Sequence, residues 1–62
     1  GVTGELTARP VIIEDHVWCG ANVTITKGVH IGSGAVIGAN AVVVNDIEAH
    51  ALVAGVPAKR IK

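Results

Sequence analysis

Apolar residues recur every six positions along most of this chain. The first position of the repeat is filled by Ile13, Cys19, Ile25, Ile31, Ile37 and Val43. The fifth position is also apolar, and it is filled by Val17, Val23, Val29, Ala35, Ala41 and Ile47. Six consecutive hexads, residues 13–48, therefore follow one rule, and a period of this kind indicates a stacked repeat architecture.

The fourth position of each hexad forms a second column that shares no residue with the apolar ones. It is filled by His16, Asn22, Gly28, Gly34, Asn40 and Asp46. These residue types tolerate a positive φ angle better than most others. We therefore predict a backbone corner at each fourth position, with the apolar positions of each hexad pointing inward.

Three hexads make one triangular coil of about 18 residues, and coils stack about 4.8 Å apart, as neighbouring strands do. Residues 18 apart then lie above one another, which places Ile13 under Ile31 and Cys19 under Ile37. The predicted fold is all-β, a parallel β-helix of about two and a half to three coils. We treat residues 1–62 as a single β-helix domain or fragment, with its hexads in residues 13–48 and a C-terminal loop tail in residues 49–62.

The composition agrees with strands and limits the partners. Valine, isoleucine and threonine supply 22 of the 62 residues, a mixture that favours strands over helices. Five basic and five acidic residues give a net charge of zero, which argues against nucleic-acid binding.

No segment reads as a membrane span or a targeting signal, and the single cysteine cannot form an internal disulfide, so we expect a cytoplasmic protein. So short a chain is marginal alone, and we expect stability from oligomerisation or from a longer parent chain.

The three histidines and Cys19 are the residues able to carry catalysis or to bind a metal, but the repeat separates them. His16 is a corner residue, and His30 ends its hexad, facing outward beneath Glu48. His50 falls in the tail. Because the histidines take different hexad positions, they face different directions, and we expect no metal. Cys19 takes an inward position and is expected to be a small core residue.

Trp18, the only aromatic residue, ends its hexad and should face outward, which indicates an interface or the wall of a ligand site. It lies in Ile13–Asn22. With residues 28–44 and Val53–Lys59, this run resembles the C-terminal half of hexapeptide-repeat O-acetyltransferases, of the galactoside, maltose and polysaccharide type. The match covers about residues 10–62. The resemblance implies a left-handed coil, a homotrimer with sites between subunits, acetyl-CoA as co-substrate and a small hydroxylated acceptor.

In that family a histidine is the general base for the acceptor hydroxyl that attacks the acetyl-CoA thioester. The resemblance places this base upstream of Gly1, so no catalytic residue is assigned within the chain. It implies that Trp18 walls the pocket and that the backbone of Ala21 and Ala39 faces the pantetheine arm. The residues that it places near the nucleotide and its phosphates are Val44, Asn45, Lys59, Arg60 and Lys62.

Three positions depart from the family pattern. Asn45 stands where the family usually has lysine, Val44 where it usually has threonine, and Cys19 where it usually has isoleucine. The first two changes weaken the expected phosphate contact, although the basic residues of the tail can compensate.

The leading hypothesis is the CoA-binding C-terminal portion of an acetyl-CoA-dependent O-acetyltransferase that acts on a sugar-like hydroxyl. The alternative is a non-catalytic trimeric β-helix module used for assembly or interaction, which the absent base favours. A zinc-dependent β-helix enzyme is a more distant third reading.

Overall fold

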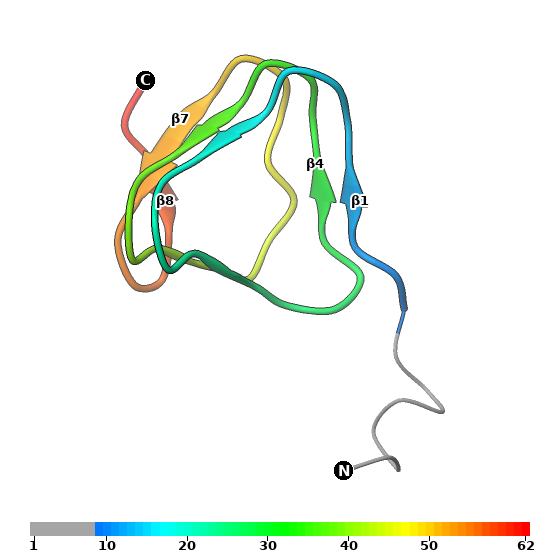
Figure 1. The fold of residues 1–62 in the computed structure, drawn as a ribbon, viewed down its shortest axis with the longest axis horizontal. Helices are drawn as coiled ribbons and strands as arrows, with labels where there is room; N and C mark the ends of the chain where they lie inside the picture. Colours follow the sequence, from blue (N-terminus) through cyan, green and yellow to red (C-terminus); the bar gives the residue numbers. More distant parts are fainter. Residues whose placement is uncertain (1–8) are drawn as a thin grey trace, which may run out of the picture.

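The computed structural model describes residues 9–62, which form short β-strands joined by turns (Figure 1). The strands are β1 (Ile12–Ile13), β2 (Trp18–Cys19), β3 (Thr24–Ile25), β4 (His30–Ile31), β5 (Val36–Ile37), β6 (Val42–Val43), β7 (Leu52–Ala54) and β8 (Lys59–Arg60). This confirms the predicted all-β class. Residues 1–8, which the predicted domain includes, lie outside the described residues. Within residues 9–62, no helix is long and apolar enough to cross a membrane.

Strands 18 residues apart pair in parallel, and the chain therefore winds into stacked coils. β1 pairs with β4, β2 with β5 and β3 with β6, so that Ile13 lies opposite Ile31 and Cys19 opposite Ile37. Seen along the stack, the sides of each coil enclose a triangular space (Figure 1). These registers confirm the stacking predicted from the repeat.

Five of the six predicted corner residues have a left-handed backbone. Their φ angles lie between 59° and 78°, and they are His16, Asn22, Gly28, Gly34 and Asn40. Glycine and asparagine adopt this region at little cost, which explains the absence of β-branched residues from the column. Each corner turns the chain into the next side of the triangle.

The sixth predicted corner, at Asp46, is wrong because the hexad that contains it is two residues short. Ile31 bridges Ile47, an offset of 16 residues instead of 18. The corner above Gly28 is therefore lost, and the next positive φ is that of His50, at 62°, which lies above Gly34 and two residues before the next strand. In Figure 1 the yellow segment between β6 and β7 cuts inside the path of the coils below it.

The prediction that residues 49–62 leave the coil as a loop is also wrong for the first part of this segment. β7 continues the third coil and pairs in parallel with β5, with Val53 opposite Ile37. The chain then turns at Gly55, whose φ is 97°, and β8 returns antiparallel along β7. An apolar pattern resumes after the shortened hexad, and this is why the coil continues.

The core fills the upper part of the stack. Its buried members are Val29, Ile31, Ala35, Ile37, Ala41, Val43, Ile47, Ala51 and Val53. In the lowest described coil the inward residues are less covered, and Ile13 is 49% exposed. Cys19 is exposed as well, so its prediction as a core residue is wrong. Its side of the coil is covered from above by Ile37, and no other described coil lies beneath it.

Candidate functional site

Two stacked corners bring Ala21 and Ala39 together, and we refer to residues 20–22 and 38–40 as the alanine corner. The Asn40 amide donates a hydrogen bond to the Ala21 carbonyl at 2.8 Å. A Cβ on Gly20 would lie 2.6 Å from the Ala39 nitrogen, so only glycine allows this approach. Within residues 9–62, the amides of Ala21 and Ala39 donate to no backbone carbonyl. The corner therefore offers two backbone donors, one coil apart, to a ligand.

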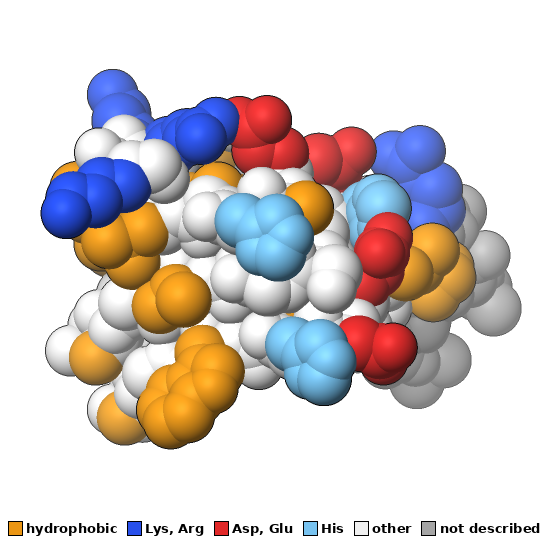
Figure 2. All heavy atoms as spheres, turned by 90° about the horizontal axis from the view of Figure 1, so that it is seen from above, with side chains coloured by type: hydrophobic (Ala, Val, Ile, Leu, Met, Phe, Trp, Pro, Cys, Tyr) orange, Lys and Arg blue, Asp and Glu red, His pale blue; other side chains and the backbone are white. Residues whose placement is uncertain are grey.

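Trp18 lies on the outer face that leads into the alanine corner. Its side chain is 75% exposed, which confirms its outward orientation. Val36 lies opposite it in β5, and Leu52 lies opposite Val36 in β7. These three residues form an apolar column on the outer face of the sheet. Figure 2 shows hydrophobic side chains gathered along one side of the molecule, with lysines and arginines at one end of them.

Val44 and Asn45 follow β6, where the shortened hexad begins. Val44 is 44% exposed and Asn45 is also exposed. Just below them, the Thr26 amide and hydroxyl both donate to the Val43 carbonyl, at 3.0 and 3.2 Å. The structure thus places Val44 and Asn45 at the opposite end of the β3–β6 side from the alanine corner.

The basic residues of the C-terminal segment do not form one cluster. Arg60 lies opposite the inward-facing Val53, whereas Lys59 lies opposite Ala54 on the other face of the hairpin. The guanidinium of Arg60 pairs with the carboxylate of Glu48. Lys62 joins the sheet through its backbone, because its carbonyl accepts the Leu52 amide at 2.9 Å. Lys59 therefore remains on the outer surface, while Arg60 is held across the end of the coil.

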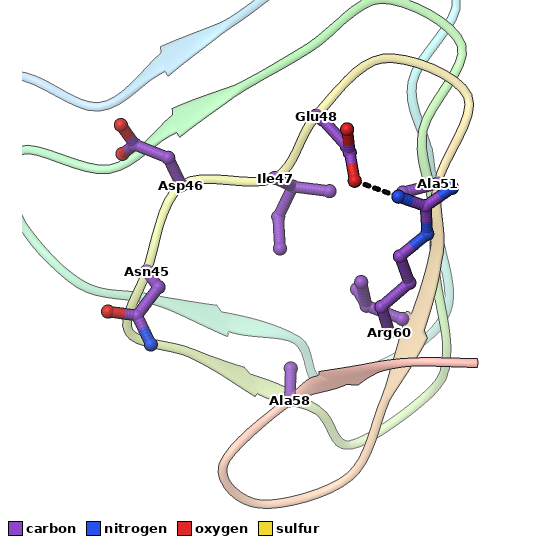
Figure 3. Close-up of a pocket in the computed structure, with 8 residues that line it drawn as sticks. Asn45, Asp46, Ile47, Glu48, Ala51, Ala58 and Arg60 are labelled. Carbon is purple, nitrogen blue, oxygen red and sulfur yellow. Dashed lines mark hydrogen bonds and ion pairs between the residues drawn. The ribbon is translucent and has the colours of Figure 1, made fainter. Parts of the chain in front are cut away.

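A pocket of about 280 Å³ opens at this upper end of the coil. Its lining consists of Asn45, Asp46, Ile47, Glu48, Ala51, Val53, Ala58 and Arg60. In Figure 3, Glu48 and Arg60 point toward each other, while the carboxylate of Asp46 points away from Ile47. The pocket thus has an apolar floor and a rim that carries the Glu48–Arg60 ion pair and the carboxylate of Asp46. Asp46 and Glu48 were not predicted at this site. The spacing from Ile47 to Ala51 and Val53 could have indicated the shortened hexad that brings them here.

The histidines lie away from the alanine corner. His30 pairs with the carboxylate of Glu14, and its backbone amide donates to Asp46 at 2.9 Å. The prediction that Glu48 lies above His30 is wrong, because the missing two residues bring Asp46 there instead. The ring of His50 lies over Gly34, with Nδ1 2.5 Å from where a Cβ would stand. Within residues 9–62, no group of three or more side chains could hold a metal ion.

The coil and its corners match a known family over more than half of the chain. The family described as the hexapeptide repeat of succinyl-transferase matches residues 10–45. This chain belongs to the hexapeptide-repeat family. Its 18-residue registers and left-handed corners are the physical form of that repeat.

Relatives and solved structures carry the same repeat. The 2,3,4,5-tetrahydropyridine-2,6-dicarboxylate N-acetyltransferase of Enterococcus faecalis is 55% identical over all 62 residues, which cover 27% of that protein. A hexapeptide-repeat acetyltransferase of Vibrio cholerae, solved with acetyl-CoA, is 46% identical with a TM-score of 0.85, over 87% of this chain and 30% of that one. Galactoside acetyltransferase in complex with CoA is 42% identical with a TM-score of 0.85, over 87% of this chain and 27% of that one. The chain thus spans about a quarter of the length of the curated relatives that it matches.

Proposed function

We propose that this chain is the CoA-binding portion of an acetyl-CoA-dependent acetyltransferase. The observation that carries the proposal is the alanine corner, where two stacked backbone amides without a backbone acceptor border the exposed Trp18. Amide donors held one coil apart suit the amide carbonyls of an extended pantetheine arm, which also has apolar methylene groups to lay against an indole. The names of the relatives and the CoA complexes among the similar structures support the same reading.

In this proposal the CoA molecule runs along the β3–β6 side of the coil. The pantetheine arm lies at Trp18, Ala21 and Ala39, and the nucleotide lies toward Val44 and Asn45. The basic residues that extend the site toward the phosphates are Lys59, Arg60 and Lys62. Because Arg60 already pairs with Glu48, Lys59 and Lys62 are the better placed of the three to meet an anion.

The reaction is transfer of the acetyl group from the thioester to a hydroxyl of a sugar-like acceptor. The acceptor oxygen attacks the thioester carbonyl, its proton passes to a general base, and the C–S bond breaks to release CoA, whose sulfur takes up a proton. Backbone donors near the thioester oppose the charge that develops on its oxygen. None of His16, His30 or His50 lies at the alanine corner of the same chain, so the base comes from another segment or subunit. An amine acceptor, as in the name of the Enterococcus relative, is the other outcome that an acceptor screen would reveal.

The proposal includes a homotrimer, a left-handed sense of the coil and a cytoplasmic location. A chain that leaves Trp18, Val36 and Val44 exposed on its outer faces has apolar surface to bury against copies of itself. Sites between subunits would then bring the base of one chain to the alanine corner of the next.

Calorimetric titration with acetyl-CoA, in a sample whose trimer is established by sedimentation, tests the proposal. We expect saturable binding that is weakened about ten-fold by Trp18→Ala, since an exposed aromatic wall supplies on the order of 1.4 kcal/mol. Ile12→Ala is the matched control, because Ile12 is an exposed apolar residue on the β1–β4 side. If a folded trimer binds no acetyl-CoA, the assembly module without catalysis becomes the better reading.

A further inference from the structure

Two cations are stacked, one coil apart, at the corner that follows β3. Lys27 precedes the corner residue Gly28, and the Gly28 amide donates to the carbonyl of Arg9 at 3.0 Å. The Arg9 side chain turns back along this corner, with Nε 3.3 Å from where a Cβ on Gly28 would stand. Both Arg9 and Lys27 are exposed. We refer to Arg9, Lys27 and Gly28 as the cationic ledge.

The ledge is uncovered because the hexad above it is two residues short. At the other corners of this coil, the carbonyl before the corner residue accepts an amide from the coil above, as Asp15 does from Gly34 and Ala21 from Asn40. Within residues 9–62, the Lys27 carbonyl accepts no backbone amide. The chain above instead cuts inward, so the ledge projects beyond it (Figure 1).

The two positive charges of the ledge are not neutralised within the described residues. Residues 9–62 contain two ion pairs, and these involve His30 and Arg60 rather than Arg9 or Lys27. The carboxylate of Asp46, in the segment above, is directed to the β4 side, where it accepts the His30 amide at 2.9 Å. A carboxylate held in this way opposes anion binding at the ledge less than a free one facing it would.

We propose that Arg9 and Lys27 bind the phosphates at the nucleotide end of CoA. This inference rests on the proposed function, in which the nucleotide lies against Val44 and Asn45. Those two residues carry no positive charge, whereas the ledge does, and it begins one residue after Thr26, whose amide and hydroxyl bond the carbonyl that precedes Val44. The guanidinium of Arg9 suits a bidentate contact with phosphate oxygens, and the ammonium of Lys27 adds a mobile point charge. The shortened hexad thus clears the space in which the phosphates sit.

Calorimetry with CoA tests the ledge in the full chain with the variants Lys27→Gln, Lys27→Arg and Arg9→Gln. Loss of one charged phosphate contact should raise the Kd for CoA about ten-fold in Lys27→Gln and in Arg9→Gln. Lys27→Arg keeps the charge and should stay close to the wild type. Both positions are exposed, so far-ultraviolet circular dichroism should show an unchanged fold in all three variants.

A second readout locates the anion. Adenosine 3′,5′-bisphosphate should shift the Gly28 amide resonance, whereas the Gly34 amide, at a corner of the same geometry without cations, should stay in place. If the chain binds CoA, but Lys27→Gln and Arg9→Gln bind it equally well and Gly28 shifts no more than Gly34, the ledge is refuted while the proposed function stands. If a folded chain binds no CoA at all, both fail.

Discussion

Gly32→Ala should destabilise the fold much more than Gly38→Ala, although both glycines follow a strand at the same hexad position. A Cβ on Gly32 would lie 2.4 Å from the backbone nitrogen of Ala49 and 2.8 Å from its Cα. A Cβ on Gly38 would meet the Cβ of Ala54 at 3.1 Å and otherwise have ordinary contacts. The pair therefore separates a backbone collision from a tight but tolerable side-chain contact.

The magnitude follows from what must move. The backbone of the third coil has to retreat by about 1 Å at Ala49 to reach normal contact, which costs about 1–3 kcal/mol as overpacking. Two hydrogen bonds hold that backbone, Gly32 to Ile47 at 2.7 Å and His50 to Ser33 at 2.9 Å. Weakening them adds about 1 kcal/mol, for a total of about 2–4 kcal/mol. For Gly38→Ala, the entropy lost from the unfolded chain stabilises by about 0.4–1 kcal/mol and offsets most of the local strain.

Urea unfolding followed by circular dichroism measures both variants, at one protein concentration because association shifts apparent stability. In a domain of this size, 1 kcal/mol corresponds to about 4–8 °C in Tm, so the two variants should be clearly separated. Equal stabilities within about 0.5 kcal/mol, or a greater loss in Gly38→Ala, would refute the close approach of the third coil at Ala49.

Three further predictions concern the core, a corner and an ion pair. Ile37→Ala, at a side chain 1% exposed, should cost about 2–4 kcal/mol, against less than about 1 kcal/mol for Ile13→Ala, as denaturant midpoints would show. Gly34→Ala should cost about 1–2 kcal/mol of stability because the φ of Gly34 is 75°, and more because the His50 ring must also move. A double-mutant cycle with His50→Gly isolates the cost of moving the ring. Equal costs of Gly34→Ala with and without the His50 side chain would disprove the contact. Glu48→Gln removes an exposed ion pair and should change stability by less than about 0.5 kcal/mol, a change that added salt should reduce further.

The repeat predicts the register of the first two coils because the positions of its apolar residues show which residues face inward. Two apolar positions and one corner position per hexad leave one way to stack, and β1 to β6 pair as that pattern requires. Trp18 was likewise predicted to face outward, because its position in the hexad alone determines on which side of the strand it lies. The burial of Cys19 could not be predicted in this way, because a residue in an end coil is covered by its neighbours in space and not by its own hexad.

The shortened hexad escaped prediction because Ile47 satisfies two interpretations. In a full hexad that starts at Val43, Ile47 takes the fifth position. In the structure it bridges Ile31, which is a first-position residue, and Ile47 therefore takes the first position of the next hexad. Both positions point inward, so burial at Ile47 does not distinguish them. The distinction appears only downstream, where Ala51 and Val53 follow Ile47 at the spacing by which Ala35 and Ile37 follow Ile31.

The hexad that is two residues short therefore accounts for most of the irregular features at the upper end of this molecule. It removes the corner predicted at Asp46, places the next left-handed residue at His50 over Gly34, and brings Asp46, rather than Glu48, over His30. Glu48 is then free to meet Arg60 across the end of the coil. A regular solenoid repeats its corners and offers the same surface on every coil. A coil that skips part of a corner breaks this equivalence and leaves a step in an otherwise regular wall. Such a step can distinguish one end of an extended ligand from the other, and here it lies where the proposed nucleotide would end.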